Sequence, residues 1–475
     1  MKISRSFFIR GTSPWLSCNP PIESIGEDEN CIRMQLAGVS NDLEQNFYVD
    51  TPSKRWLSKA HECEWAGITC FTDRFRTEIP GGYEECMYRV AAATFDANGM
   101  KNTLPIQMSR LPCLNVLTFL SNDDMTGTIP PELFSWDYKD EGGIFQRIRL
   151  ERLPKITGTL PDTLFDMKRL VALELGDMSL TGTLPNRFSE LPIFGTFHVF
   201  GNDQLDFTIP TNATSIRSIR VHRNSNISSI ERIPTEIGNL QLLDRLWMFD
   251  NNLQGELPSE LSNCAKMIDF RVRNNQLTGT LPNYNWPDLA NFDLANNRLE
   301  GPLPPSFNRL PERLQNFYLA NNRFNGTLDP GIATSCGNLR RFEVDNNEFT
   351  GPIPDFSSCP QLNTFEVNLN KFEGEVPFDI CKLKTSDGLT ILNADCLAYP
   401  PQNECKCCTA CCDSSTRVCE ASVSSQLRQR QLRHSKILDE DKAEESLFWN
   451  ENVFANEVNK QQNEWTIPSD SLGFY

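Results

Sequence analysis

The chain has 475 residues, enough for roughly three domains of ordinary size or for one long array of repeats. Its 45 basic and 62 acidic residues give a formal net charge of −17, which disfavours nucleic acid or an anionic membrane surface as a partner. No apolar run approaches the ~20 residues of a transmembrane helix. We therefore expect proteins, peptides or glycans as partners.

The N-terminus and the cysteines give opposite indications of the compartment. The apolar run Phe7-Phe8-Ile9 stops at Arg10 and is shorter than the core of a secretory signal. Seventeen cysteines, most of them near the two ends, instead indicate disulfides and an oxidising compartment. We expect an extracellular or cell-surface protein whose start is incomplete in this sequence. Three Asn-x-Ser/Thr triplets agree and are glycosylation candidates: Asn212, Asn226 and Asn325.

A tetrapeptide related to Gly-Thr-Leu-Pro recurs through the centre of the chain. Clear copies include Leu277-Thr-Gly-Thr-Leu-Pro282 and Phe349-Thr-Gly-Pro-Ile-Pro354. Nine clear and three degenerate copies define twelve turns, most of them 22 to 25 residues long, and the one longer step contains an insertion near Asp137 to Gly143. Such a period predicts a solenoid in which each turn packs on its neighbours.

A second pattern precedes each tetrapeptide, as in Leu243-x-x-Leu246-x-Met248-x-x-Asn251-x-Leu253. It predicts one short strand per turn, with apolar side chains pointing into the solenoid and the intervening side chains pointing outward. Strands of successive turns then form a parallel sheet on the concave face. The repeated Asn, as at Asn275 and Asn347, is expected to be buried and to satisfy backbone groups where the chain leaves the strand.

The L-x-G-x-[IL]-P repeat resembles the plant-type subfamily of leucine-rich repeat proteins, which includes receptor ectodomains and polygalacturonase inhibitors. Upstream, Trp56-Leu57 and Cys63-Glu-Trp-Ala-Gly-Ile-Thr-Cys70 resemble the N-terminal cap of that subfamily, which implies a Cys63–Cys70 disulfide. The resemblance implies an α/β fold, a right-handed leucine-rich repeat solenoid of about twelve repeats with cysteine-containing caps. It implies recognition as the function, and no kinase sequence follows the array.

We divide the chain into an N-terminal segment with its cap (1–86), the repeat array (87–396), a cysteine-rich cap (397–419) and a tail (420–475). Eight cysteines lie between Cys381 and Cys419. We favour disulfides over a zinc cluster there, because the apolar end of a solenoid must be covered by a cap and disulfides can hold that cap without a metal. Within the array we expect Cys264, Cys336 and Cys359 to be buried thiols, and Cys336 with Cys359 is the one pair placed to bridge successive turns.

The tail changes charge along its length. It begins basic, at Leu427-Arg-Gln-Arg-Gln-Leu-Arg433, and turns acidic at Asp439-Glu-Asp441. Its low apolar content favours disorder. A docking motif and an untethered tail both fit this composition, and the untethered tail is favoured.

The outward strand positions of the central turns are rich in arginine and aromatic residues, which dominate interface hot spots. Exposed Trp and Phe are costly without a partner, so we predict a concave surface that binds a protein, a peptide or an acidic glycan. Acidic residues between Asp293 and Glu366 follow in the last turns, where a solubilising role is favoured. The candidate ligand-binding residues are Arg147, Arg149, His198, Phe200, Arg220, His222, Arg245, Trp247, Phe249, Arg271 and Arg273.

The motifs indicate no catalytic or metal-binding arrangement. G-x-S-x-G, H-E-x-x-H and the P-loop are absent from the sequence, and four histidines leave little material for a catalytic triad. We expect no enzyme activity, no cofactor and no metal site. Two functions remain open: a receptor-like or inhibitor-like recognition module, and a structural protein of a cell wall, matrix or ice surface. The irregular arginine and aromatic columns favour the recognition module.

Overall fold

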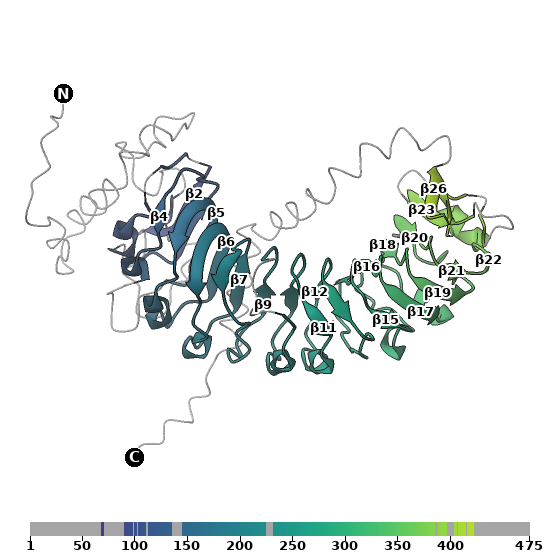
Figure 1. The fold of residues 1–475 in the computed structure, drawn as a ribbon, viewed down its shortest axis with the longest axis horizontal. Helices are drawn as coiled ribbons and strands as arrows, with labels where there is room; N and C mark the ends of the chain where they lie inside the picture. The colour runs from purple at the N-terminus through teal and green to yellow at the C-terminus, as the bar shows by residue number, and fades with distance from the viewer. Residues whose placement is uncertain are drawn as a thin grey trace, which may run out of the picture. The chain divides into compact units, whose positions relative to one another are not determined.

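A computed structural model describes Ile68–Cys70 and residues 90–421, with gaps at 98, 102, 111–112, 135–144, 225–230, 385–387, 397–402, 406 and 415. The chain forms two compact units, the first ending at Phe207 and the second beginning at Thr208. Figure 1 draws the strands of both units, coloured by residue number. The tetrapeptides recur across this boundary without a break, so the sequence does not indicate the division. Several predictions fall outside the described residues: Cys63, the insertion at 137–143, Asn226 and the tail from 422.

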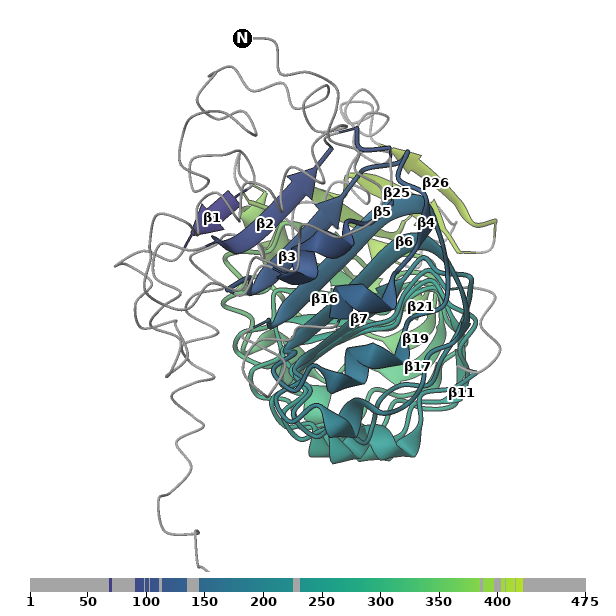
Figure 2. The same ribbon diagram turned by 90° about the vertical axis from the view of Figure 1, so that its left-hand side faces the viewer.

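The first unit is built on a parallel sheet. Each of its main strands pairs in parallel with the next: β2 (Val90–Asp96), β3 (Val116–Leu120), β5 (Arg147–Gly158), β6 (Ala172–Thr183) and β7 (Thr196–Phe200). Strand β1 (Ile68–Cys70) lies antiparallel beside β2, where the N-terminal cap is predicted (Figure 2). The far halves of β5 and β6 pair with the short strands β4 (Gly127–Thr128) and β8 (Gln204–Asp206).

The second unit repeats the same design with shorter strands. Its parallel ladder follows chain order through β9 (Ser218–Arg220), β10 (Arg245–Trp247), β12 (Asp269–Arg271), β14 (Asn291–Asp293), β16 (Asn316–Tyr318), β18 (Arg341–Glu343), β20 (Thr364–Glu366), β23 (Ile391–Asp395) and β25 (Ala410–Asp413). Strand β26 (Val418–Ala421) turns back antiparallel to β25 and ends the sheet.

The tetrapeptides form the bends beside the main strands. In the second unit they also pair across turns: β11 (Gln254–Glu256) with β13 (Gln276–Thr278), then β15 (Glu300–Gly301), β17 (Arg323–Thr327), β19 (Glu348–Gly351) and β21 (Lys371–Phe372) in series, and β22 (Gly374–Glu375) with β24 (Asn403–Glu404). The glycine of the tetrapeptide is required there, because Gly279 has a φ of 77°.

Short 3-10 helices follow most of these bends. Many begin directly after the tetrapeptide proline, which fixes an extended backbone at the helix start, as at Pro258 before η11. In the first unit they are η6 (Ile106–Arg110), η7 (Pro131–Phe134), η8 (Asp162–Asp166) and η9 (Phe188–Glu190). In the second they are η10 (Thr235–Asn239), η11 (Ser259–Asn263), η12 (Pro305–Phe307), η13 (Pro330–Ala333) and η14 (Phe378–Leu383). Among the described helices, none has the length and apolar character needed to cross a membrane.

The repeat pattern places an outward-pointing strand residue in each of the twelve predicted turns, from Thr94 in the first to Glu366 in the last. All twelve lie in observed strands, which confirms the twelve turns. The structure adds β23 as a further repeat strand and continues the parallel sheet into the cap through β25. The sequence around β23, Ile391-Leu-Asn-Ala-Asp395, lacks the Asn-x-Leu ending and the tetrapeptide, so the repeat pattern does not reveal it.

The repeated apolar positions form a continuous core. In the second unit, Phe270, Phe292, Phe317 and Phe342 are fully buried and stack in turn, with ring centroids 5.8, 5.7 and 5.5 Å apart. Each ring therefore contacts its equivalents in the turns before and after. Such offset aromatic pairs contribute roughly 0.5–1.5 kcal/mol each beyond the burial of their area.

The repeated asparagines have the backbone role predicted for them. The Asn347 amide donates to the carbonyl oxygens of Leu319, Val344 and Asp345, at 2.9 to 3.2 Å. Its Oδ1 accepts a hydrogen bond from the amide of Phe324 at 2.9 Å. One buried side chain thus satisfies backbone groups in its own turn and in the turn before, which ties successive turns together.

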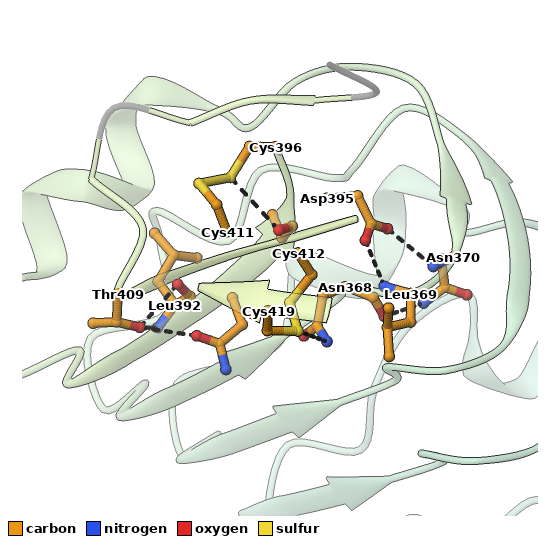
Figure 3. Close-up of a disulfide and its surroundings, with 12 residues drawn as sticks. Asn368, Leu369, Asn370, Leu392, Asp395, Cys396, Thr409, Cys411, Cys412 and Cys419 are labelled. Carbon is orange, nitrogen blue, oxygen red and sulfur yellow. Dashed lines mark hydrogen bonds between the residues drawn. A yellow bond between two sulfur atoms is a disulfide. The ribbon is translucent and has the colours of Figure 1, made fainter. Parts of the chain in front are cut away.

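Disulfides close the C-terminal end of the sheet. The eight cysteines from Cys381 to Cys419 form four bonds, which supports the prediction of disulfides: Cys381–Cys407, Cys396–Cys411, Cys405–Cys408 and Cys412–Cys419. Figure 3 shows the second and the fourth of these bonds. A fifth bond joins Cys336 to Cys359 on successive turns, the one pair for which the sequence indicated a bridge. Cys264 is a free buried thiol, as expected, and burial raises its pKa to about 11.

Candidate functional site

The outward side chains of the parallel strands, which we call the strand face, carry most of the candidate ligand-binding residues. Side chains alternate along a strand, so positions two residues apart point to the same side. In the second unit, the parallel register aligns Trp247 on β10 with Arg220 on β9 and with Arg271 on β12. A second row, two residues beyond the end of each of these strands, contains His222, Phe249 and Arg273.

The first row forms a cation–aromatic stack, which we call the Trp247 ladder. The guanidinium carbon of Arg220 lies 3.9 Å from the centroid of the indole, and that of Arg271 lies 4.5 Å from it. Because β9 and β12 flank β10, the two guanidinium groups approach the indole from opposite sides. Each contact is worth about 0.5–2 kcal/mol, with the larger values at sites removed from water.

The second row repeats this arrangement as the Phe249 ladder. The His222 imidazole stacks on the Phe249 ring at 4.3 Å, with 15° between the planes, and Arg273 lies 4.5 Å from the same ring on the other side. The two aromatic rings are 6.2 Å apart. Six of the predicted site residues thus form two parallel stacks on neighbouring turns.

Acidic residues pair with two of the ladder arginines. Arg271 donates two hydrogen bonds to the Asp269 carboxylate, at 2.8 and 3.0 Å, and Arg273 donates one to Asp293 at 3.4 Å. Asp293 is deeply buried, which raises its pKa, although Arg273 opposes that change. Arg245, the remaining predicted residue of this unit, lies beside the ladders and pairs with Asp244 at 3.3 Å.

The expectation that Trp and Phe on this face are exposed is wrong. Trp247 and Phe249 are each only 4% exposed, and so is Phe200 of the first unit. Stacking explains part of this, because the flanking arginine and histidine side chains cover both faces of each ladder ring. Among the described residues, the buried indole N–H of Trp247 nevertheless has no hydrogen-bond partner, a state that costs about 1–3 kcal/mol.

The first unit contains the other predicted residues in a different environment. Arg149 forms a two-pronged hydrogen bond with Glu151, 2.8 Å at each contact. The fully buried Glu174 lies 3.5 Å from Arg147, 3.6 Å from Arg149 and 3.7 Å from His198. The repeat pattern does not identify Glu151 and Glu174 as the partners of these basic residues. This cluster is an ion-pair network rather than a basic surface.

The last turns of the second unit present the acidic part of the strand face. Burial, together with the neighbouring Glu366 and Asp345 carboxylates, raises the pKa of Glu343 to about 8, while Arg341 opposes this change. Glu343 and Glu366 lie side by side on β18 and β20. Along β26, Cys419 approaches this face, with its Sγ 4.0 Å from the Asn368 amide (Figure 3). Within the described residues, no group of three or more metal-ligating side chains is present.

Known proteins match the chain in sequence. The Leucine Rich Repeat family model matches residues 288–310. Receptor-like protein 32 of Arabidopsis thaliana is 28% identical over 246 residues, which are 51% of this chain and 26% of that protein. Receptor-like protein 53 of the same plant is 26% identical over 149 residues, 31% of this chain and 15% of that protein. The chain spans between 7% and 26% of the length of the curated relatives it matches.

Solved structures with the same fold include two plant receptors. The peptide hormone receptor RGFR1, in complex with RGF2, has a TM-score of 0.53 at 22% identity, covering 70% of this chain and 61% of that one. The ectodomain of the Arabidopsis receptor kinase HAESA, in complex with an IDA peptide hormone, has a TM-score of 0.52 at 21% identity, covering 79% and 70%. The chain thus has the leucine-rich repeat solenoid fold, and it is similar in sequence to plant receptor-like proteins and in fold to plant receptor ectodomains.

Proposed function

We propose that the chain is an extracellular recognition module, receptor-like or inhibitor-like, and that the two ladders of the second unit bind an acidic peptide or a sulfated glycan. The observation that carries this proposal is the pair of stacks around Trp247 and Phe249. They bring three guanidinium groups and an imidazole to neighbouring turns of one face. The buried indole N–H adds a hydrogen-bond donor that a ligand carboxylate or sulfate would satisfy.

Two further observations support recognition rather than catalysis. The similar plant receptors bind peptide hormones, according to their structures, although at 21–22% identity they share only the fold with this chain. Cations stacked on aromatic rings are also pre-ordered, so a ligand would lose little side-chain entropy in them. A peptide is therefore the favoured ligand, and its acidic groups would lie over the ladders.

The experiment uses two labelled synthetic decapeptides, one alternating Glu and Gly and one alternating Gln and Gly, together with a sulfated hexasaccharide. Binding to the full chain is compared with binding to Arg273→Gln, and Arg309→Gln is the matched control. Arg309 also lies in the second unit, but its side chain is 70% exposed and away from the strand face. We expect Arg273→Gln to weaken the Glu decapeptide or the hexasaccharide at least tenfold and Arg309→Gln to change neither. Equal losses in both variants, or no binding of any probe, would overturn the proposal.

Export is part of the same proposal. Five disulfides in the second unit need an oxidising compartment, and Asn325, exposed on β17, offers an accessible glycosylation site. Asn212 is exposed as well. Produced through a eukaryotic secretory pathway, the chain should gain mobility on a gel after N-glycosidase treatment. Asn325→Gln should reduce this difference in mobility. A chain whose mobility is the same before and after N-glycosidase treatment would contradict the prediction of export.

A further inference from the structure

The strand face of the second unit changes charge in a fixed order. The turns next to the C-terminal cap present Glu343, Asp345 and Glu366, whereas the turns further from the cap present the cationic ladders. A segment that leaves the cap and runs along this face would therefore meet acidic side chains first and cationic ones second.

The chain beyond the cap has the complementary order of charge. Its first charged stretch is basic, with Arg428, Arg430 and Arg433. The next is acidic, with Asp439, Glu440 and Asp441. Opposite charges in matching order favour one register of binding and disfavour the reversed one, because the reversed register would place like charges together.

The geometry of the cap and the length of the segment fit this order. Strand β26 ends at Ala421 on the sheet edge beyond β20, and its Cys419 approaches Asn368 on the strand face. Eight strand-to-strand steps separate β26 from β10, about 38 Å at the usual spacing. Asp439 follows Ala421 by eighteen residues, which reach about 60 Å when extended and therefore cover this distance in an extended conformation.

We propose that residues 427–441 bind the strand face of the second unit as an intramolecular ligand, with the Arg428–Arg433 stretch over the acidic turns and the Asp439–Asp441 stretch over the ladders. This inference rests on the proposed function, because the tail would occupy the same site and compete with an external acidic ligand. The chain would then recognise its partner only when that partner displaces the tail.

The test neutralises the acidic stretch in the full chain, with Asp439→Asn, Glu440→Gln and Asp441→Asn combined. The matched control removes three acidic charges elsewhere in the tail, with Glu457→Gln, Glu464→Gln and Asp470→Asn combined. Affinity for the Glu decapeptide should rise at least tenfold in the first variant and stay unchanged in the control. A synthetic peptide of residues 425–446, added to the first variant, should restore the competition.

A second measurement distinguishes a failure of the tail inference from a failure of the proposed function. A photo-crosslinking amino acid at Leu438 of the full chain should link to peptides that contain Trp247 or Phe249, and the same group at Ile467 should not. Decapeptide binding that is equal in all variants, without crosslinks from position 438, would overturn the tail inference and leave the proposed function standing. Crosslinks from position 438 without decapeptide binding in any variant would leave the tail in place and overturn the proposed function.

Discussion

The repeated asparagine is the residue on which the stacking of turns most directly depends. Asn347 is 7% exposed and makes four hydrogen bonds to backbone groups. Its replacement by alanine leaves those groups buried without partners, each at a cost of about 1–3 kcal/mol before relaxation. The same residue at the same place in turn after turn thus serves the scaffold and leaves the strand face free to vary.

We expect Asn347→Ala to lower the free energy of unfolding by about 3 kcal/mol, measured by urea denaturation. Asn338→Ala is the matched control, because Asn338 is exposed and makes a single hydrogen bond to the carbonyl of Glu312. That control should lose less than about 1 kcal/mol. Equal losses in the two variants would show that the buried amide does not hold the turns together.

Glu343 provides a prediction about pH. Its pKa of about 8 in the folded chain lies above the ordinary 4.5, so the folded chain binds more protons than the unfolded chain between those two values. This carboxyl therefore lowers stability progressively as pH rises from 4.5 to 8, and the loss is complete above pH 8.

Glu343→Gln keeps the shape of the side chain and removes the charge. The variant should have a higher Tm than the wild type at pH 9 and nearly the same Tm at pH 4, measured by thermal denaturation. Glu300→Gln, on an exposed residue of the same unit, should leave the pH dependence unchanged. An unaltered pH profile in the Glu343 variant would contradict the assignment.

Each repeat turn could be predicted as an element because three local signals agree in it: alternating apolar residues, a buried Asn and a Gly-Pro bend. The strands from β2 to β20 follow from those signals alone. Strand β23 could not, since its turn lacks the bend, and it forms because β20 offers an edge to pair with. Element pairing, rather than local pattern, decides the end of the array.

The candidate site shows the same limit. The alternation along β10 and β12 places Trp247, Phe249, Arg271 and Arg273 on one face, which sequence reasoning recovered. Their burial and their pairing with Asp269 and Asp293 depend on the lateral distance between neighbouring strands and on side-chain rotamers. The repeat pattern determines neither the distance between strands nor the rotamers, so the exposure of the aromatic residues was predicted wrongly.

The contribution of the disulfide between successive turns to the free energy of unfolding can be measured. Cys336 and Cys359 close a loop of 23 residues. Removing the bond with Cys336→Ala and Cys359→Ala should cost about 3 kcal/mol in urea denaturation, mainly because the unfolded chain regains freedom. Cys264→Ala, at a buried cysteine without a bond, should cost about 1 kcal/mol or less. A similar cost in both would mean that the cysteines contribute by packing alone.

At the scale of the whole molecule, the net charge of −17 is a poor guide to the partner. The charge is distributed so that the ladders of the second unit gather cations while the last turns gather carboxylates. A ligand responds to this local field more than to the total, because charges further away than about 8–10 Å are screened at physiological salt. An acidic ligand is thus compatible with an acidic protein.

The most direct test of the account is the affinity of the chain with the neutralised tail for the Glu decapeptide and for its Gln counterpart, measured at 50 and 200 mM salt. The account predicts that the Glu decapeptide binds at least tenfold more tightly at low salt and that the difference shrinks at high salt, since the contacts are ionic. Arg273→Gln in the same background should reduce the difference as well. Equal affinities for the two decapeptides at both salt concentrations would contradict the assignment of the ladders as a site for acidic ligands.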